Sequence, residues 1–196
     1  MRWPAPVPGR DDAALLARRV LGIDPGSAVT GWGIVETAGT SLIHLAYGTV
    51  VTAGIHGQAA RLERIYRGLE EVIDSYNPDG VCVERVFFAR NPQSALKLGQ
   101  ARGVAILAAA RRSLVVHEYA AVEIKAAVVG YGHATKQQVQ MMIASLLRLS
   151  GKLPADAADA LAAAICHLHM QVLRARLTEA LPKSIAPLRP RKSIRR

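Results

Sequence analysis

The chain has 196 residues, a net charge of +10 and 51% hydrophobic residues. The length suits one domain with short tails, and the hydrophobic content excludes a wholly disordered chain. The apolar stretches are too short to cross a bilayer, and residues 1–19 lack the apolar core of a secretory signal. Two cysteines, Cys82 and Cys166, exclude a disulfide framework and a multi-cysteine zinc site. We therefore expect a cytoplasmic protein with no membrane partner.

The positive charge is concentrated near the C-terminus. Residues 174–196 contain eight Lys or Arg and one acid, so this segment carries +7 and the remaining residues carry +3. A basic tail favours a polyanion through counterion release. Nucleic acid fits better than a membrane, because the tail has no amphipathic apolar face. We expect a flexible leader at 1–19, one folded domain at 20–177 and a basic, disordered tail at 178–196.

Hydrophobic patterning predicts an α/β fold, a mixed sheet flanked by helices. Short apolar or alternating runs predict five strands, at 20–24, 30–36, 41–51, 81–83 and 114–117. Helical spacing and composition predict helices at 61–76, 92–112, 122–129, 135–148 and 156–176. The first three strands form a meander and should be antiparallel. Helical crossovers should place the fourth and fifth strands parallel to the first, giving a five-stranded mixed sheet.

Four acids stand at positions that favour a shared site. Asp24 and Glu84 each close a hydrophobic strand, while Asp156 and Asp159 share one face of an otherwise apolar helix. Taken singly, each acid is explained by a turn, a helix N-cap or a solvated surface. Four carboxylates at one sheet edge would instead need a hard cation, and oxygen-only ligands suit Mg²⁺ or Mn²⁺. Two such ions about 4 Å apart are the arrangement used for phosphodiester cleavage.

Cations and one aromatic pair flank the proposed site in the sequence. Arg85, Arg90, Lys125 and Lys136 are unremarkable as surface cations, but around a metal site they would position phosphate groups. Phe87 belongs to an adjacent phenylalanine pair just past Glu84. One member could stack on an unpaired base, and a core contact is an equal alternative.

The remaining candidate ligands favour structural roles. His167 and His169 are too close along one helix to share a metal face, and we expect both to be partly exposed. Cys82 lies in an apolar strand and Cys166 in an apolar helix, which predicts two inert core thiols.

Three segments resemble the RuvC family of bacterial Holliday-junction resolvases in order and spacing. They are Leu21–Ser27 with Thr30–Gly33, the long stretch Val83–Gly103, and Ala155–Leu161. The similarity extends over about residues 20–169, and the central stretch is its most specific part. An Asp-Pro-Gly sequence alone would not identify the family.

The resemblance implies a ribonuclease H-like fold and a Mg²⁺-dependent endonuclease that makes paired nicks in four-way DNA junctions during recombination and repair. It implies 5′-phosphate and 3′-hydroxyl ends, a homodimer with the helix after Asn91 at its interface, and the RuvA–RuvB branch-migration complex as partner. Catalytic and metal-binding roles carry over to Asp24, Glu84, Asp156 and Asp159. DNA-contacting roles carry over to Phe87, Lys125 and Lys136, and Arg90 is a further candidate for phosphate contact.

Three alternatives stay open at this stage. A related nuclease could use the same acids on RNA or on simpler DNA. The run Ile23–Ser27 also fits the phosphate loop of sugar kinases and actin-like ATPases, although 196 residues leave little room for their second lobe. A non-catalytic basic DNA-binding module would not depend on Asp24 at all.

Overall fold

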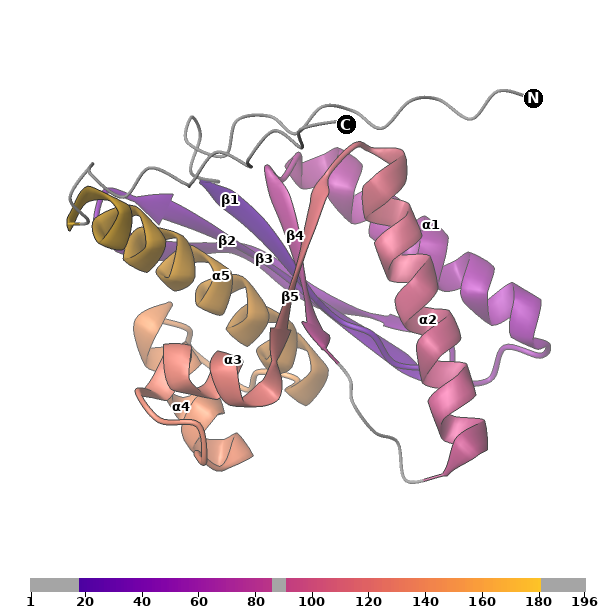
Figure 1. Ribbon diagram of the computed structural model, residues 1–196. Coiled ribbons are helices and arrows are strands. Elements are labelled where there is room, and N and C mark those ends of the chain that lie inside the picture. The colour runs from indigo at the N-terminus through magenta and orange to yellow at the C-terminus, as the bar shows by residue number, and fades with distance from the viewer. Residues whose placement is uncertain (1–17, 86–90, 181–196) are drawn as a thin grey trace, which may run out of the picture.

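The computed structural model describes residues 18–85 and 91–180, which form three layers (Figure 1). A central sheet has two helices on one face and three on the other. The strands are β1 Arg19–Asp24, β2 Val29–Ala38, β3 Ser41–Val51, β4 Gly80–Arg85 and β5 Val115–Ala120. The helices are α1 Gln58–Tyr76, α2 Pro92–Arg111, α3 Ala121–Val129, α4 Lys136–Leu146 and α5 Ala155–Ala180.

The sheet has the strand order β3-β2-β1-β4-β5. The β1–β2 and β2–β3 pairs are antiparallel, and the β1–β4 and β4–β5 pairs are parallel. This confirms the predicted meander and the predicted direction of the fourth and fifth strands. The carboxyl ends of β1 and β4 therefore meet at one edge of the sheet.

Element boundaries differ from the sequence-based expectation by a few residues. The strand β4 continues through Glu84 to Arg85, so Glu84 lies inside the strand rather than after it. The strand β1 begins at Arg19, and α5 continues to Ala180, three residues past the expected end of the folded domain. Within the described ranges, no helix is both long enough and apolar enough to cross a membrane.

Two hydrophobic cores lie on the two faces of the sheet. One packs β-strand residues such as Leu21 and Val83 against α1 and α2. The other packs Val20 and Cys82 against α3, α4 and α5. The face that carries α5 also carries the side chains of Asp24 and Glu84, because alternate residues of a strand point to the same face. The fold thus places both strand acids beneath α5.

Candidate metal and nucleic-acid site

Asp24 and Glu84 are brought together by the parallel pairing of β1 and β4. The register aligns Ile23 with Val83, so the next residue on each strand is one of the two acids. Asp24 is the last residue of β1, and both carboxyl groups are half-buried. The expected convergence of strand-end acids therefore occurs, at the carboxyl ends of the neighbouring strands β1 and β4.

The helix α5 supplies the second pair of acids. Asp156 lies in its first turn and Asp159 lies three residues later, and both side chains are half-buried. Their neighbours Ala157, Ala158 and Ala160 are fully buried against the sheet. The small side chains let the helix lie close to the strands, so its first two turns carry the two carboxylates down to the sheet edge.

Glycines in the strands make this close approach possible. A Cβ atom at Gly31 would overlap the carbonyl oxygen of Asp156, and one at Gly22 would overlap that of Ala160. Gly31 is the residue of β2 that pairs with Asp24. Sequence reasoning missed this packing role, although glycines inside a strand are a known signal for close backbone approach.

The four carboxylates are electrostatically coupled. Burial raises the pKa of Asp24 to about 7, and repulsion from Asp159, Glu84 and Asp156 adds to the rise. Burial also raises the pKa of Glu84, and Asp159 again contributes. The structure thus places the other three acids within electrostatic range of Asp24, in a partly desolvated place where the negative charges oppose one another.

Two lysines oppose this repulsion. Lys136, the first residue of α4, places its Nζ 2.5 Å from Oδ2 of Asp159. Its charge lowers the pKa of both Asp24 and Glu84. Lys125, on α3, also lowers the pKa of Glu84. Both lysines, which flank the site in the sequence, therefore lie within electrostatic range of the acids.

The donor set fits a hard divalent cation. All four candidate ligands are carboxylates, which are the groups that Mg²⁺ and Mn²⁺ prefer. A cation among them would relieve the repulsion that raises the pKa of Asp24. In residues 18–85 and 91–180, no three Asp, Glu, His or Cys side chains are gathered closely enough to form a coordination shell. The match between these residues and a divalent cation therefore rests on the chemistry of the carboxylates and on their mutual repulsion. One of the four, Asp159, is paired with Lys136.

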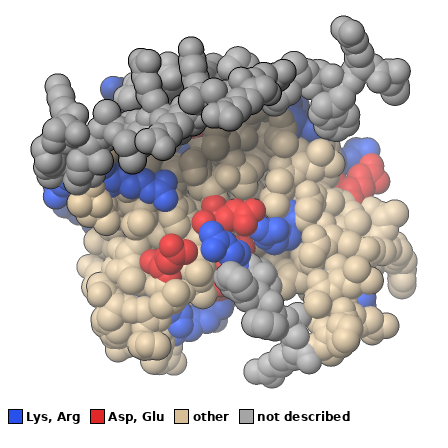
Figure 2. All heavy atoms as spheres, in the orientation of Figure 1, with Lys and Arg blue, Asp and Glu red and all other residues tan. Residues whose placement is uncertain are grey.

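The remaining DNA-contact candidates divide into two groups. Phe87 and Arg90 lie outside the described residues. Arg85 is exposed on the α2 side of the sheet, and its guanidinium donates to the carbonyl oxygen of Glu118 at 3.3 Å. In the view of Figure 2, acidic and basic side chains lie next to one another in the middle of the visible face.

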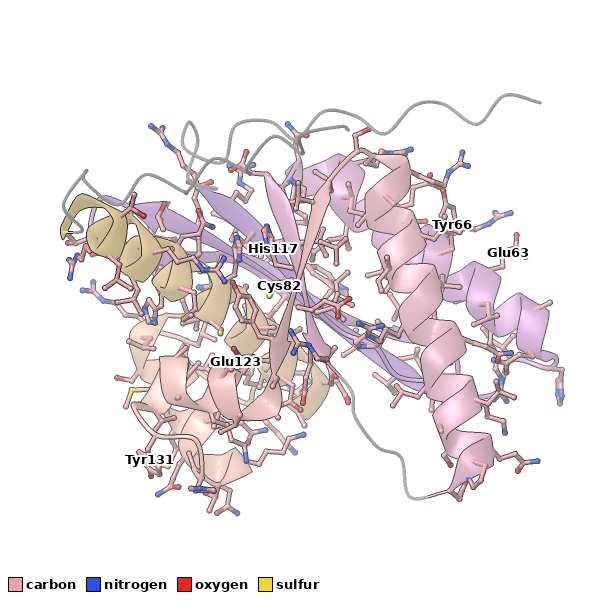
Figure 3. All side chains as sticks on the ribbon, viewed as in Figure 1. Glu63, Tyr66, Cys82, His117, Glu123 and Tyr131 are labelled. Atoms are coloured by element: carbon pink, nitrogen blue, oxygen red, sulfur yellow. The ribbon has the colours of Figure 1, made fainter. Side chains whose placement is uncertain are left out.

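The expectation of a partly exposed His167 is wrong. The side chain is 2% exposed, its ring stacks on that of His117 at a centroid distance of 4.0 Å, and its Nδ1 lies 3.0 Å from the Tyr119 hydroxyl. Figure 3 shows His117 and Cys82 between the sheet and α5. The error arises because α5 is covered on two sides, by the sheet and by α3. The expected partial exposure of His169 and burial of both cysteines are confirmed.

Comparisons with known proteins agree on one family. The family model described as crossover junction endodeoxyribonuclease RuvC matches residues 20–167. The RuvC protein of Geobacter sulfurreducens is 54% identical over 156 residues, which is 80% of this chain and 95% of the relative. That of Geobacter metallireducens is 57% identical over 149 residues, covering 76% of this chain and 91% of the relative.

Solved structures show the same relationship. The structure of Thermus thermophilus RuvC in complex with a Holliday junction substrate matches with a TM-score of 0.76 and 33% identity, covering 80% of this chain and 96% of that one. A yeast mitochondrial Holliday junction resolvase matches at 13% identity with a TM-score of 0.61, which supports the fold alone. The fold is ribonuclease H-like, as the sequence resemblance implied. The chain therefore belongs to the RuvC family of crossover junction endodeoxyribonucleases.

Proposed function

We propose that this chain is a Holliday-junction resolvase, a structure-specific endonuclease that nicks four-way DNA junctions in recombination and repair. The activity depends on a divalent metal ion, as in the rest of the family. The observation that carries the proposal is the convergence of Asp24, Glu84, Asp156 and Asp159 at one sheet edge in a chain of this family. A phosphate-loop kinase does not need this acidic cluster, and a DNA-binding module would be weakened by it.

The four acids are the proposed catalytic and metal-binding residues. We infer that they hold Mg²⁺, with Mn²⁺ as a substitute, and that two ions bind in each site. Bound there, the ions supply an activated water and stabilise the leaving 3′ oxygen. The carboxylates would fix the positions of the two metal ions. Because the acids are half-buried, fewer water molecules would compete with the carboxylates for the ions. The expected products carry 5′-phosphate and 3′-hydroxyl ends.

Basic residues around the acids are the proposed DNA contacts. Lys125 and Lys136 lie on α3 and α4 within electrostatic range of the carboxylates, where they would position the scissile phosphate. Phe87 and Arg90 complete the proposed contact set from the segment after β4. The basic segment 178–196 would add sequence-independent attraction to DNA outside the folded domain of residues 20–177.

We also propose that the protein works as a homodimer in the cytoplasm. Each chain supplies one acidic site, whereas resolution requires two symmetric nicks, so a two-fold dimer matches the near two-fold symmetry of a four-way junction. The helix α2 supports this role, because Leu96 is 64% exposed and Leu107 is 52% exposed while the opposite face of the helix is buried. The RuvA–RuvB branch-migration complex is the proposed partner on the junction.

Substrate choice tests the proposed function. We would compare cleavage of a mobile four-way junction, a linear duplex of the same sequence and an RNA–DNA hybrid, all with Mg²⁺. Symmetric, religatable nicks confined to the junction are expected. Equal cleavage of the hybrid or the linear duplex would favour a different nuclease. Light scattering coupled to gel filtration tests the dimer separately, with Leu96→Glu and Leu107→Glu expected to shift the mass toward the monomer.

A further inference from the structure

The ion pair between Lys136 and Asp159 joins the N-terminal parts of two helices. Lys136 is the first residue of α4, after the N-cap Thr135, and Asp159 lies in the second turn of α5. The Nζ–Oδ2 distance is 2.5 Å, the lysine side chain is 57% exposed and the aspartate side chain is 27% exposed. One of the four proposed metal ligands is therefore already bound to a cation that belongs to the protein.

Without the nearby acids, the positive charge of Lys136 would destabilise the N-terminus of α4. The N-terminus of a helix carries a partial positive charge, so a lysine at the first helical position is disfavoured by the helix dipole. Four nearby carboxylates reverse that preference. The hydrogen bond to Asp159 raises the pKa of Lys136, and the charges of Asp24 and Asp156 contribute as well. The ammonium group is thus held by Asp159 and attracted by the charges of Asp24 and Asp156.

We propose that Lys136 competes with the metal ion for Asp159, and that metal binding releases Lys136 to contact the substrate phosphate. In this proposal the divalent ion takes Oδ2 of Asp159, the oxygen that already accepts from the ammonium group. Metal binding at that oxygen then breaks an existing charge-assisted hydrogen bond, which weakens the apparent metal affinity. Once released, the lysine remains on α4 beside the site, with its charge available to a phosphate. This inference rests on the proposed metal site.

Lys125 provides a matched comparison. It is also a lysine near the cluster, and its charge lowers the pKa of Glu84 as that of Lys136 does. Asp159 receives its ion pair from Lys136. Replacing either lysine by glutamine removes one positive charge near the acids, but only Lys136→Gln removes the direct competitor for the aspartate oxygen.

The test measures metal binding without DNA. Titration calorimetry with Mg²⁺ is carried out on the full-length wild type, Lys136→Gln and Lys125→Gln. We expect Lys136→Gln to bind Mg²⁺ about two- to fivefold more tightly than the wild type, the range of a partly exposed ion pair. The change for Lys125→Gln should be smaller. Unchanged or weaker binding by Lys136→Gln, or an equal gain in both variants, would overturn the proposal.

A measurement on the wild type keeps the test decisive if the variant folds poorly. In a nitrogen-15 NMR spectrum selective for lysine ammonium groups, Lys136 should give a slowly exchanging signal in EDTA, because its Nζ is held by Asp159. Adding Mg²⁺ should remove that signal, and persistence of the signal in saturating Mg²⁺ would contradict the displacement. A wild type that binds no Mg²⁺ at all would instead refute the proposed metal site.

Discussion

The backbone of Asp156 rests on Gly31, the residue of β2 that pairs with Asp24 on β1. A methyl group at Gly31 would overlap the Asp156 carbonyl oxygen and come within 2.9 Å of the backbone nitrogen of Ala157. The distance between α5 and the sheet is thus fixed by a contact that lies directly beside the acidic cluster. This contact links a strand glycine to the position of two proposed metal ligands.

Gly31→Ala should therefore impair cleavage through the position of α5. A displacement of about 1 Å in a catalytic group can cost on the order of 100-fold in rate. Gly33→Ala is the matched control, because its new methyl group would meet the flexible side chain of Leu161 instead of the helix backbone. Both substitutions overpack the same interface, at a cost of about 1–3 kcal/mol in unfolding free energy.

The measurement is the junction-cleavage rate at saturating Mg²⁺, alongside the melting temperature of each variant. We expect Gly31→Ala to lose much more activity than Gly33→Ala for a similar loss of stability. A wild-type rate in Gly31→Ala would show that the contact does not position the acids.

Asp24→Asn should stabilise the protein when metal is removed. The pKa of Asp24 is raised to about 7 in the fold, above its ordinary value of 3.8, so ionisation at pH 8 destabilises the folded state. Asparagine removes that charge. We expect a melting temperature in EDTA at pH 8 that is higher than that of the wild type by at least a few degrees.

Adding Mg²⁺ should narrow or reverse this difference in melting temperature between Asp24→Asn and the wild type, because only the intact site gains stability from the bound ion. Glu84→Gln should likewise raise the melting temperature in EDTA. A lower melting temperature of Asp24→Asn in EDTA would indicate that burial and the neighbouring acids do not disfavour the ionised Asp24 carboxyl in the folded protein.

The buried histidine His167 should make stability depend on pH. Burial lowers its pKa to about 3, with further contributions from the charges of His117 and Arg174. The ordinary pKa is about 6.5, so between pH 6.5 and pH 3 the unfolded chain binds a proton that the folded chain does not. Stability from this group is complete above pH 6.5 and falls as the pH decreases, by about 2 kcal/mol at pH 5.

Denaturant unfolding at pH 7 and pH 5 checks this expectation. The loss of unfolding free energy between the two values should be smaller in His167→Gln than in the wild type. His133→Gln, which changes an exposed histidine, serves as the control. An equal pH-dependent loss in wild type and His167→Gln would show that His167 is not the group responsible.

The strand directions and the acidic cluster could be predicted from the sequence, because both depend on local patterns. Short apolar runs ending in Asp24 and near Glu84, with helical crossovers between them, determine which strand ends meet. The acids on α5 were recognisable because they interrupt a small, apolar helix face. The order of the predicted elements and the periodicity within each of them were sufficient to predict these features.

Other features depend on packing between elements distant in sequence. The burial of His167 requires α5 to be covered by both the sheet and α3. The pairing of Lys136 with Asp159 depends on the placement of α4 against α5, and periodicity along either helix does not specify it. The Gly31 contact likewise requires knowledge of which helix crosses β2. Phe87 and Arg90 remain predictions, since they lie outside the described residues.

We propose that the four carboxylates form the metal-dependent nuclease site. This proposal is tested most directly by cleavage of a synthetic mobile four-way junction by wild type and Asp24→Asn, with Mg²⁺ or with EDTA. We predict paired nicks by the wild type in Mg²⁺ alone, and no cleavage by Asp24→Asn, which should still bind the junction at least as well because a negative charge near the phosphate is gone. Undiminished cleavage by Asp24→Asn, or by the wild type in EDTA, would contradict the account.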